Sequence, residues 1–180
     1  MTSKIQIEEE IRRLEFDTCS AQRYAREGKL EEWVHKYLMA GQWANPGLSN
    51  GLKLQRRWWH GPVEINLTDL ARAVGPESGM EYQVENDYWL NRIRKMAKSL
   101  TDPLSIPPLI VEYRSGELSI RDGNTRHGAM SVVGWTKCWV IIWYNTESDY
   151  REFSYVHSTQ QNQRKTQSRT THFRRDLHNR

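Results

Sequence analysis

Cysteines and long apolar runs are both scarce in this sequence, and each absence excludes a class of protein. The only cysteines among the 180 residues are Cys19 and Cys138. Two cysteines are too few for a disulfide framework, so we expect a reducing compartment. Mean hydropathy is −0.82, and no apolar run approaches the roughly 20 residues that span a membrane. The glutamates at 8–10 do not fit a secretory signal peptide. We therefore expect a cytoplasmic protein with no membrane partner.

Apolar residues in general are few, at 37% of the chain, which favours a compact core with well-solvated surroundings. A chain of 180 residues is long enough for one such core. Eight Trp and eight Tyr supply much of the burial, because each aromatic side chain hides a large area. We expect a helical N-terminal extension at 1–60, an α/β core at 61–146, and a polar, basic helix or tail at 147–180.

Hydrophobic periodicity predicts the order of elements in the core. Apolar residues recur at helical spacing up to Leu100, and Pro103 ends that helix. Residues 138–143 are apolar on both faces, which is typical of a central strand. The expected elements are a strand at 63–67, a short helix at 68–70, a loop at 75–87, a helix capped by Asn86 or Asp87, strands at 109–113 and 118–120, a helix that ends at Gly134, and the strand at 138–143.

The most informative segment is DGNTRHGAM, at residues 122–130, between a strand and a helix. Gly123 permits a sharp turn there. The helix that follows presents unpaired N–H groups and the positive end of its dipole, which together bind phosphate readily. Arg126 adds a cationic fork within reach. We expect any functional site of this chain to lie at this turn.

Motif and element order together resemble the ParB/sulfiredoxin superfamily. Its signature is G-x-x-R-x-x-A after a β-hairpin, and Gly123, Arg126 and Ala129 occupy those positions. The likeness runs over residues 63–144. It implies a mixed sheet flanked by helices and a turn that cradles nucleotide phosphates. Members include proteins that bind and hydrolyse CTP, ATP-using sulfiredoxins, free-serine kinases, and plasmid proteins with ATPase or nuclease activity. The fold therefore does not select the reaction.

The chain departs from each subfamily. Sulfiredoxins have a cysteine in this turn, where this chain has Asn124 and Thr125. Partition proteins carry a helix-turn-helix domain behind the core, and the mostly polar residues after Tyr144 are too few for one. Free-serine kinases have paired histidines that are missing here. We therefore disfavour peroxiredoxin repair and DNA partition by the usual architecture.

Within the turn, residue chemistry suggests a role for each position. Arg126 is expected to bind phosphate through charge-assisted hydrogen bonds. Asn124 and Thr125 have side-chain and backbone donors for phosphate oxygens. Gly123 allows the turn, and Gly128 is consistent with close approach of a ligand, because its low helix propensity calls for a steric reason.

Four further residues are candidates for catalysis or metal binding, each with a structural alternative. Asp122 is either a Mg²⁺ ligand or a former of the Asp-Gly turn. His127 either contacts the nucleotide and transfers a proton, or is structural. Glu81 and Glu85 are candidate bases or metal ligands, with Tyr88 nearby as a further candidate contact. For Glu85 the alternative is a carboxylate that stabilises the helix dipole.

The N-terminal extension and the C-terminal segment contain further candidates for ligand contact. Helices are expected at 5–18 and 30–39, the second with Trp33 and Tyr37 directed inward, followed by a loop at 41–51. The RRWWH segment at 56–60 either stacks a base beside phosphate or anchors the N-terminal helices on the core. The C-terminal segment either is solvated, or folds as a polar helix, or contacts DNA or RNA. The cations for that contact are Arg164, Lys165, Arg169, Arg174 and Arg175.

Three functional hypotheses remain from the sequence. The first is an enzyme that binds ATP or another nucleoside triphosphate with Mg²⁺ at residues 123–126 and hydrolyses or transfers phosphate. The second is a DNA-binding protein or nuclease that uses the same turn and the basic tail on the phosphate backbone. The third is a non-catalytic interaction module with the same fold.

Overall fold

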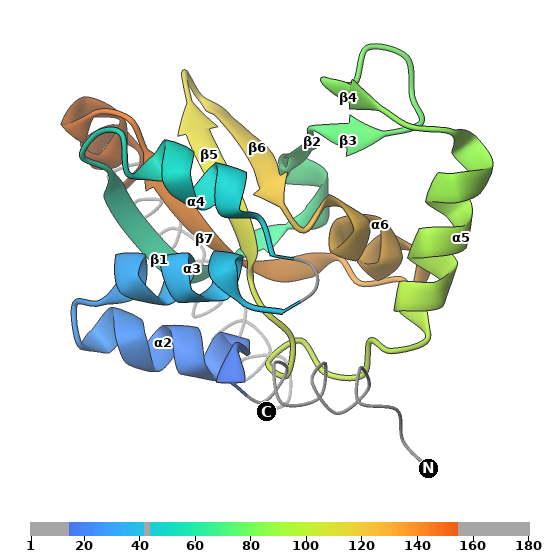
Figure 1. Cartoon of the computed structure of the whole chain (residues 1–180), viewed down its shortest axis with the longest axis horizontal. Coiled ribbons are helices and arrows are strands. Elements are labelled where there is room, and N and C mark those ends of the chain that lie inside the picture. Colours follow the sequence, from blue (N-terminus) through green and yellow to red (C-terminus); the bar gives the residue numbers. More distant parts are fainter. Residues whose placement is uncertain (1–14, 42–43, 155–180) are drawn as a thin grey trace, which may run out of the picture.

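The computed structural model describes residues 15–41 and 44–154, which form a mixed α/β fold with helices on both faces of a sheet (Figure 1). In chain order the elements are helices α2 (Thr18–Arg26), α3 (Leu30–Met39) and α4 (Pro46–Leu52), strand β1 (Trp58–Asn66), the 3-10 helix η1 (Leu67–Asp69), strands β2 (Ala71–Arg72), β3 (Val74–Gly75) and β4 (Tyr82–Gln83), helix α5 (Asn86–Ala97), strands β5 (Leu109–Arg114) and β6 (Glu117–Asp122), helix α6 (Asn124–Val132) and strand β7 (Lys137–Tyr144). Residues 147–154 are also helical.

The sheet is mixed, with strand order β1-β7-β5-β6-β2. Strand β7 runs parallel to β5 and antiparallel to β1. Strands β5 and β6 form an antiparallel hairpin, and the short β2 pairs parallel to β6. β3 and β4 form a separate parallel pair. The prediction of a central strand at 138–143 is confirmed, because β7 lies between two strands and its side chains are buried on both faces.

Two apolar clusters occupy the two faces of this sheet. On one face, Met130 of α6 packs against Ile120, Val140 and their neighbours. On the other face, Ile110 and Trp143 pack against α2, α3 and α4. Strand residues alternate between the faces, so consecutive residues of β5 and β7 serve both clusters. The N-terminal helices are thus a full layer of the fold.

Most predicted core elements are confirmed, with corrections in the bounds. The segment expected as a loop at 75–87 contains strand β4 and ends where α5 begins at Asn86. The prediction that Asn86 or Asp87 caps α5 is wrong, because Asn86 is the first helical residue and the N-cap is Glu85, which forms no side-chain cap hydrogen bond. The expected loop at 41–51 is wrong, because residues from Pro46 form α4. Asn45 caps this helix through its side-chain oxygen, which accepts from the Leu48 N–H, and Pro46 suits the first helical position. The domain boundary expected at residue 60 falls within β1.

Several sequence predictions concern residues outside the described ranges. The N-terminal helix expected at 5–18 is described only from residue 15, and Thr18 begins α2. The basic residues of the C-terminal segment also lie outside the described part of the chain. Within residues 15–41 and 44–154, no helix is long and apolar enough to cross a membrane.

Trp59 anchors the helical layer on the sheet, as one of the two interpretations of residues 56–60 predicted. Trp59 packs with the N-terminal helices and lies 6.4 Å from Trp143, measured between ring centroids. Trp58 packs on the opposite cluster, and the Arg56 guanidinium lies 4.9 Å from the centre of its ring. Arg57 donates to Asn145 at the end of β7. These aromatic side chains therefore serve packing.

Helices α5 and α6 pack face to face, and Gly128 is the point of closest approach. Figure 1 shows α6 between α5 and the sheet. A Cβ on Gly128 would lie 2.9 Å from Ile93 Cγ2 and 3.0 Å from the Trp89 ring. The steric reason for this glycine is therefore helix packing within the protein.

We expect Gly128→Ala to destabilise the protein by about 1–2 kcal/mol, because overpacking exceeds the gain in helix propensity. Gly51→Ala in α4 is the matched control: its Cβ would meet nothing within 4 Å, and its φ is not positive. The free energy of unfolding of this control should rise by up to about 1 kcal/mol. Urea unfolding of both variants measures the difference, and a Gly128→Ala protein as stable as Gly51→Ala would contradict close packing.

Candidate functional site

The predicted turn joins β6 to α6 through Gly123, whose φ of 98° is in the left-handed region. Glycine adopts this conformation without strain. Having no side chain, Gly123 cannot cap the helix, and no side-chain cap hydrogen bond forms there. The first N–H groups of α6 therefore lack the capping oxygen that usually satisfies them. This is the arrangement that favours an anion.

Arg126 fills the space beside Gly123. A Cβ at Gly123 would lie 2.5 Å from Leu109 Cδ2 and 2.7 Å from Arg126 Nη2. The guanidinium is therefore folded back over the turn. Glycine is required here for the backbone conformation and for room for the protein's own side chains.

The Arg126 guanidinium is part of a buried cluster of three side chains, one of which comes from helix α3 of the N-terminal layer. Its Nη2 donates to Asp122 Oδ2 at 3.0 Å, and its Nη1 donates to the Tyr37 hydroxyl. Tyr37 in turn donates to the same Asp122 oxygen at 3.0 Å. The side chains of Arg126 and Asp122 are only 12% and 18% exposed. We call these three residues the Arg126 cluster.

A bulge in β6 directs Asp122 into this cluster. Asp122 pairs with Ile110, whereas Ile120 pairs with Val111, so Arg121 is an extra residue in the strand. A bulge of this kind re-aims the side chain that follows it. Asp122 consequently lies on the face of the sheet that α3 covers, within reach of Tyr37.

The electrostatics of the cluster keep Arg126 charged. Burial alone lowers the pKa of the Arg126 guanidinium, but the oxygens of Tyr37 and Asp122 outweigh burial and raise the pKa above its ordinary value. Arg126 Nε is buried without a hydrogen-bond partner among the described residues. The cation is thus neutralised by Asp122 and keeps one N–H donor unused.

Asn124, a predicted phosphate donor, connects the turn to the β2–β3 link instead. Its Oδ1 accepts from the N–H groups of Ala73 at 2.9 Å and Val74 at 3.2 Å. Its Nδ2 donates to the Ile120 carbonyl at 3.2 Å. The side chain is buried, and both of its polar atoms are used. Thr125, by contrast, is half-buried, and its hydroxyl forms no hydrogen bond with a described residue.

His127 is 8% exposed and packs beneath the turn. Its Nε2 lies 3.0 Å from the Leu67 carbonyl oxygen. Because a carbonyl only accepts, the proton is on Nε2, which leaves Nδ1 as a buried acceptor without a described partner. Burial lowers the pKa of His127, and Arg72 adds to this, while the hydrogen bond to Leu67 opposes it. His127 is therefore neutral at neutral pH.

The acidic candidates do not converge on the turn. Glu81 pairs with Arg121, which also pairs with Glu112 at 2.8 Å. Glu85 is exposed at the start of α5, as its helix-dipole interpretation predicts. Tyr88 is also exposed, and the Arg92 guanidinium lies over its ring.

A metal ion has no ready set of ligands at the turn. Asp122 Oδ2 is already used by Arg126 and Tyr37. No group of three or more His, Cys, Asp or Glu suited to a metal occurs among residues 15–41 and 44–154. Asp122 Oδ2 would have to leave Arg126 and Tyr37 to bind Mg²⁺, and the role of Asp122 as a metal ligand stays a prediction.

No known protein family, curated protein or solved structure matches this chain. Membership of the ParB/sulfiredoxin superfamily therefore stays a prediction, which rests on the motif residues and the order of elements alone. Sequence reasoning found Arg126 and Asp122 but missed that Tyr37 joins them. The inward-facing position of Tyr37 indicated that its side chain is buried. The i,i+4 spacing of Asp122 and Arg126 indicated that the two can form an ion pair.

Protonation of His127 should destabilise the fold. Its pKa is lowered from 6.5 in the folded state, so the unfolded chain takes up the proton first and stability falls as pH drops below about 6.5. The loss is at most about 1.4 kcal/mol per pH unit for one group. His127→Gln keeps a donor for Leu67 and does not titrate, so its unfolding free energy should fall less between pH 7 and pH 5. Parallel pH curves for the two proteins would contradict this.

Proposed function

We propose that this chain is a ParB/sulfiredoxin-like protein that binds a phosphate group of a nucleotide at the N-terminus of α6. The order of elements around the turn supports the superfamily: a strand, a long helix, a hairpin, the Gly123 turn, a helix and a central strand. The observation that carries phosphate binding is the uncapped start of α6 after a left-handed glycine.

Backbone N–H groups and Thr125 are the first contacts in this proposal. A helix N-terminus attracts an anion through its free N–H groups and its dipole. The Thr125 hydroxyl, which has no described hydrogen-bond partner, is placed in the same helical turn. Asn124 keeps its structural role, because both polar atoms of its side chain bind backbone groups.

Arg126 joins the phosphate only if its present contacts are exchanged. Its two terminal nitrogens bind Asp122 and Tyr37, so an arriving phosphate competes with both. Phosphate is a strong partner for a guanidinium, since it offers more charge and more acceptor oxygens than one carboxylate. We therefore infer that the described structure is a closed state, in which the Tyr37 hydroxyl of α3 keeps the Arg126 guanidinium from binding the phosphate.

Phosphate hydrolysis or transfer requires a base beside the bound phosphate. Glu81 would first have to leave Arg121, and Glu85 lies at the start of another helix. His127 is the only candidate base next to the turn, and its Nδ1 is buried. We propose nucleotide binding as the function, with ATP or another nucleoside triphosphate as the ligand class.

A non-catalytic interaction module is the second candidate, and one observation favours it. Almost every side chain of the motif already has an internal role: Asp122 and Arg126 in the buried cluster, Asn124 as a bridge, and His127 on Leu67. The motif then preserves the fold without binding a ligand. The alternative of DNA binding depends on cations outside the described residues, and steep salt dependence of polynucleotide binding tests it.

Nucleotide binding should respond in opposite directions to two substitutions. Tyr37→Phe removes the hydroxyl that holds Arg126, so affinity for ATP should rise about tenfold, since a hydrogen bond to a charged group contributes about 1.5–3 kcal/mol. Arg126→Lys removes the fork and should lower affinity. Equilibrium binding of ATP, CTP and ADP by wild type and both variants measures this.

Tyr24→Phe is the matched control for that experiment, because Tyr24 lies in the same helical layer and its hydroxyl accepts from Lys36, outside the Arg126 cluster. Thermal unfolding verifies that each variant is folded. If neither wild type nor Tyr37→Phe binds any nucleotide, the interaction module replaces the proposal.

A further inference from the structure

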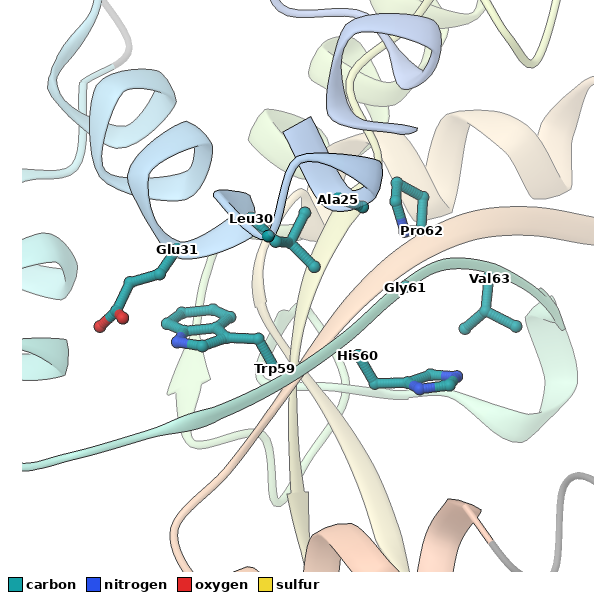
Figure 2. A pocket seen from close by; sticks show the side chains of 9 residues that line it. Ala25, Leu30, Glu31, Trp59, His60, Gly61, Pro62 and Val63 are labelled. Carbon is teal, nitrogen blue, oxygen red and sulfur yellow. The ribbon is translucent and has the colours of Figure 1, made fainter. Parts of the chain in front are cut away.

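A cavity of about 510 Å³ lies between the α2–α3 connection and strand β1 (Figure 2). Its volume is in the range of small-molecule pockets. The α2–α3 side contributes Ala25, Gly28, Leu30 and Glu31, and β1 contributes residues 59–63. None of the residues of the Gly123 turn lines it. The cavity is therefore a separate candidate site.

The bulge in β1 shapes one wall of this cavity. The ladder between β1 and β7 is interrupted between His60 and Val63. Gly61 approaches β7 so closely that a Cβ would lie 2.6 Å from the Val140 carbonyl oxygen. β1 is also an edge strand among the strands that the structure describes, and none of these fills the space beyond it.

The lining combines an aromatic and apolar surface with one carboxylate. Trp59, Pro62 and Leu30 supply the apolar surface, and Glu31 is the only Asp, Glu, Lys or Arg among the described residues of the lining. In Figure 2 the Glu31 side chain extends from the first turn of α3 on the side of the cavity where the Trp59 indole lies. An indole face attracts cations, most strongly among the aromatic side chains.

Among residues 15–41 and 44–154, no permanent cation neutralises the Glu31 carboxylate. Among the described residues its ionisable neighbour is His35, whose Nε2 is 3.9 Å away from a carboxylate oxygen. Burial and then Lys53 lower the pKa of His35, and together they outweigh the Glu31 carboxylate, which raises it, so this histidine is neutral at neutral pH. The adjacent Glu32 differs, because Lys36 Nζ lies 2.7 Å from its carboxylate. Within residues 15–41 and 44–154, no Lys or Arg forms an ion pair with Glu31.

We propose that this cavity binds an amine cation with an apolar body, the cation between Glu31 and the Trp59 indole and the body against Leu30 and Pro62. A free aromatic amine and a lysine side chain share this chemistry. The proposal is independent of nucleotide binding, since the two sites share no residue. The amine would bind to the layer that the N-terminal helices form.

The test titrates the protein with 2-phenylethylamine and follows the indole N–H resonance of Trp59 by NMR, identified with Trp59→Phe. We expect a saturable shift with the amine and none with its neutral isostere 2-phenylethanol. N-acetyl-lysine methylamide, titrated in parallel, distinguishes a lysine side chain from a free aromatic amine. Glu31→Gln should weaken binding about fivefold, as expected for loss of a partly exposed ion pair, because the contact of the cation with the Trp59 indole remains.

Glu32→Gln is the control, because it removes a neighbouring carboxylate that Lys36 already neutralises. Its affinity for the amine should equal that of wild type. Three results would overturn the proposal: no shift with either amine, equal binding of the alcohol, or equal weakening by both substitutions. Because Glu31 is 52% exposed, neither variant is expected to unfold the protein.

Discussion

The buried ion pair between Arg126 and Asp122, with Tyr37 bound to both, is the interaction on which the rest of the structure depends. It joins three segments that are distant in sequence: helix α3, the end of β6 and the start of α6. A charge in this position is tolerated only while its partners remain, and removal of one partner of a buried pair costs about 3–5 kcal/mol. The cluster therefore fixes where the helical layer sits on the sheet.

This constraint explains why the turn residues have the identities they have. Gly123 is small because the Arg126 guanidinium lies against it, and Gly128 is small because α5 does. Asn124 holds the β2–β3 link, and His127 holds η1 through Leu67. A motif that resembles a phosphate cradle is thus also a set of internal contacts. Any ligand at the start of α6 acts on a structure whose cationic side chain is already bound.

The sequence predicts those parts of this fold that depend on local patterns. The apolar run at 138–143 predicts a central strand, and β7 confirms it. The Gly-, Asn- and Pro-rich stretch before Leu52 instead suggests a loop, although Asn45 and Pro46 are good helix-starting residues and α4 forms there. The expected turn at Gly123 is present with a positive φ.

The chemistry of the site was harder to predict, because its contacts join residues far apart in the chain. Tyr37 binds residues more than 80 positions away, and no spacing rule relates α3 to β6. The bulge at Arg121 decides which face Asp122 occupies, and alternation alone would place it on the other face. Glu81 accepts a hydrogen bond from Arg121, which lies 40 positions further along the chain.

A double-mutant cycle between Tyr37→Phe and Asp122→Asn tests the central claim most directly. The free energy of unfolding in urea is measured for wild type, both single variants and the double variant. If the three side chains act as one cluster, each single variant is less stable and the two changes are coupled by at least about 1 kcal/mol. Tyr24→Phe combined with Asp122→Asn should be additive within about 0.5 kcal/mol. Additive effects for Tyr37 and Asp122 would contradict the account, because α3 would then be held on the sheet independently of the turn.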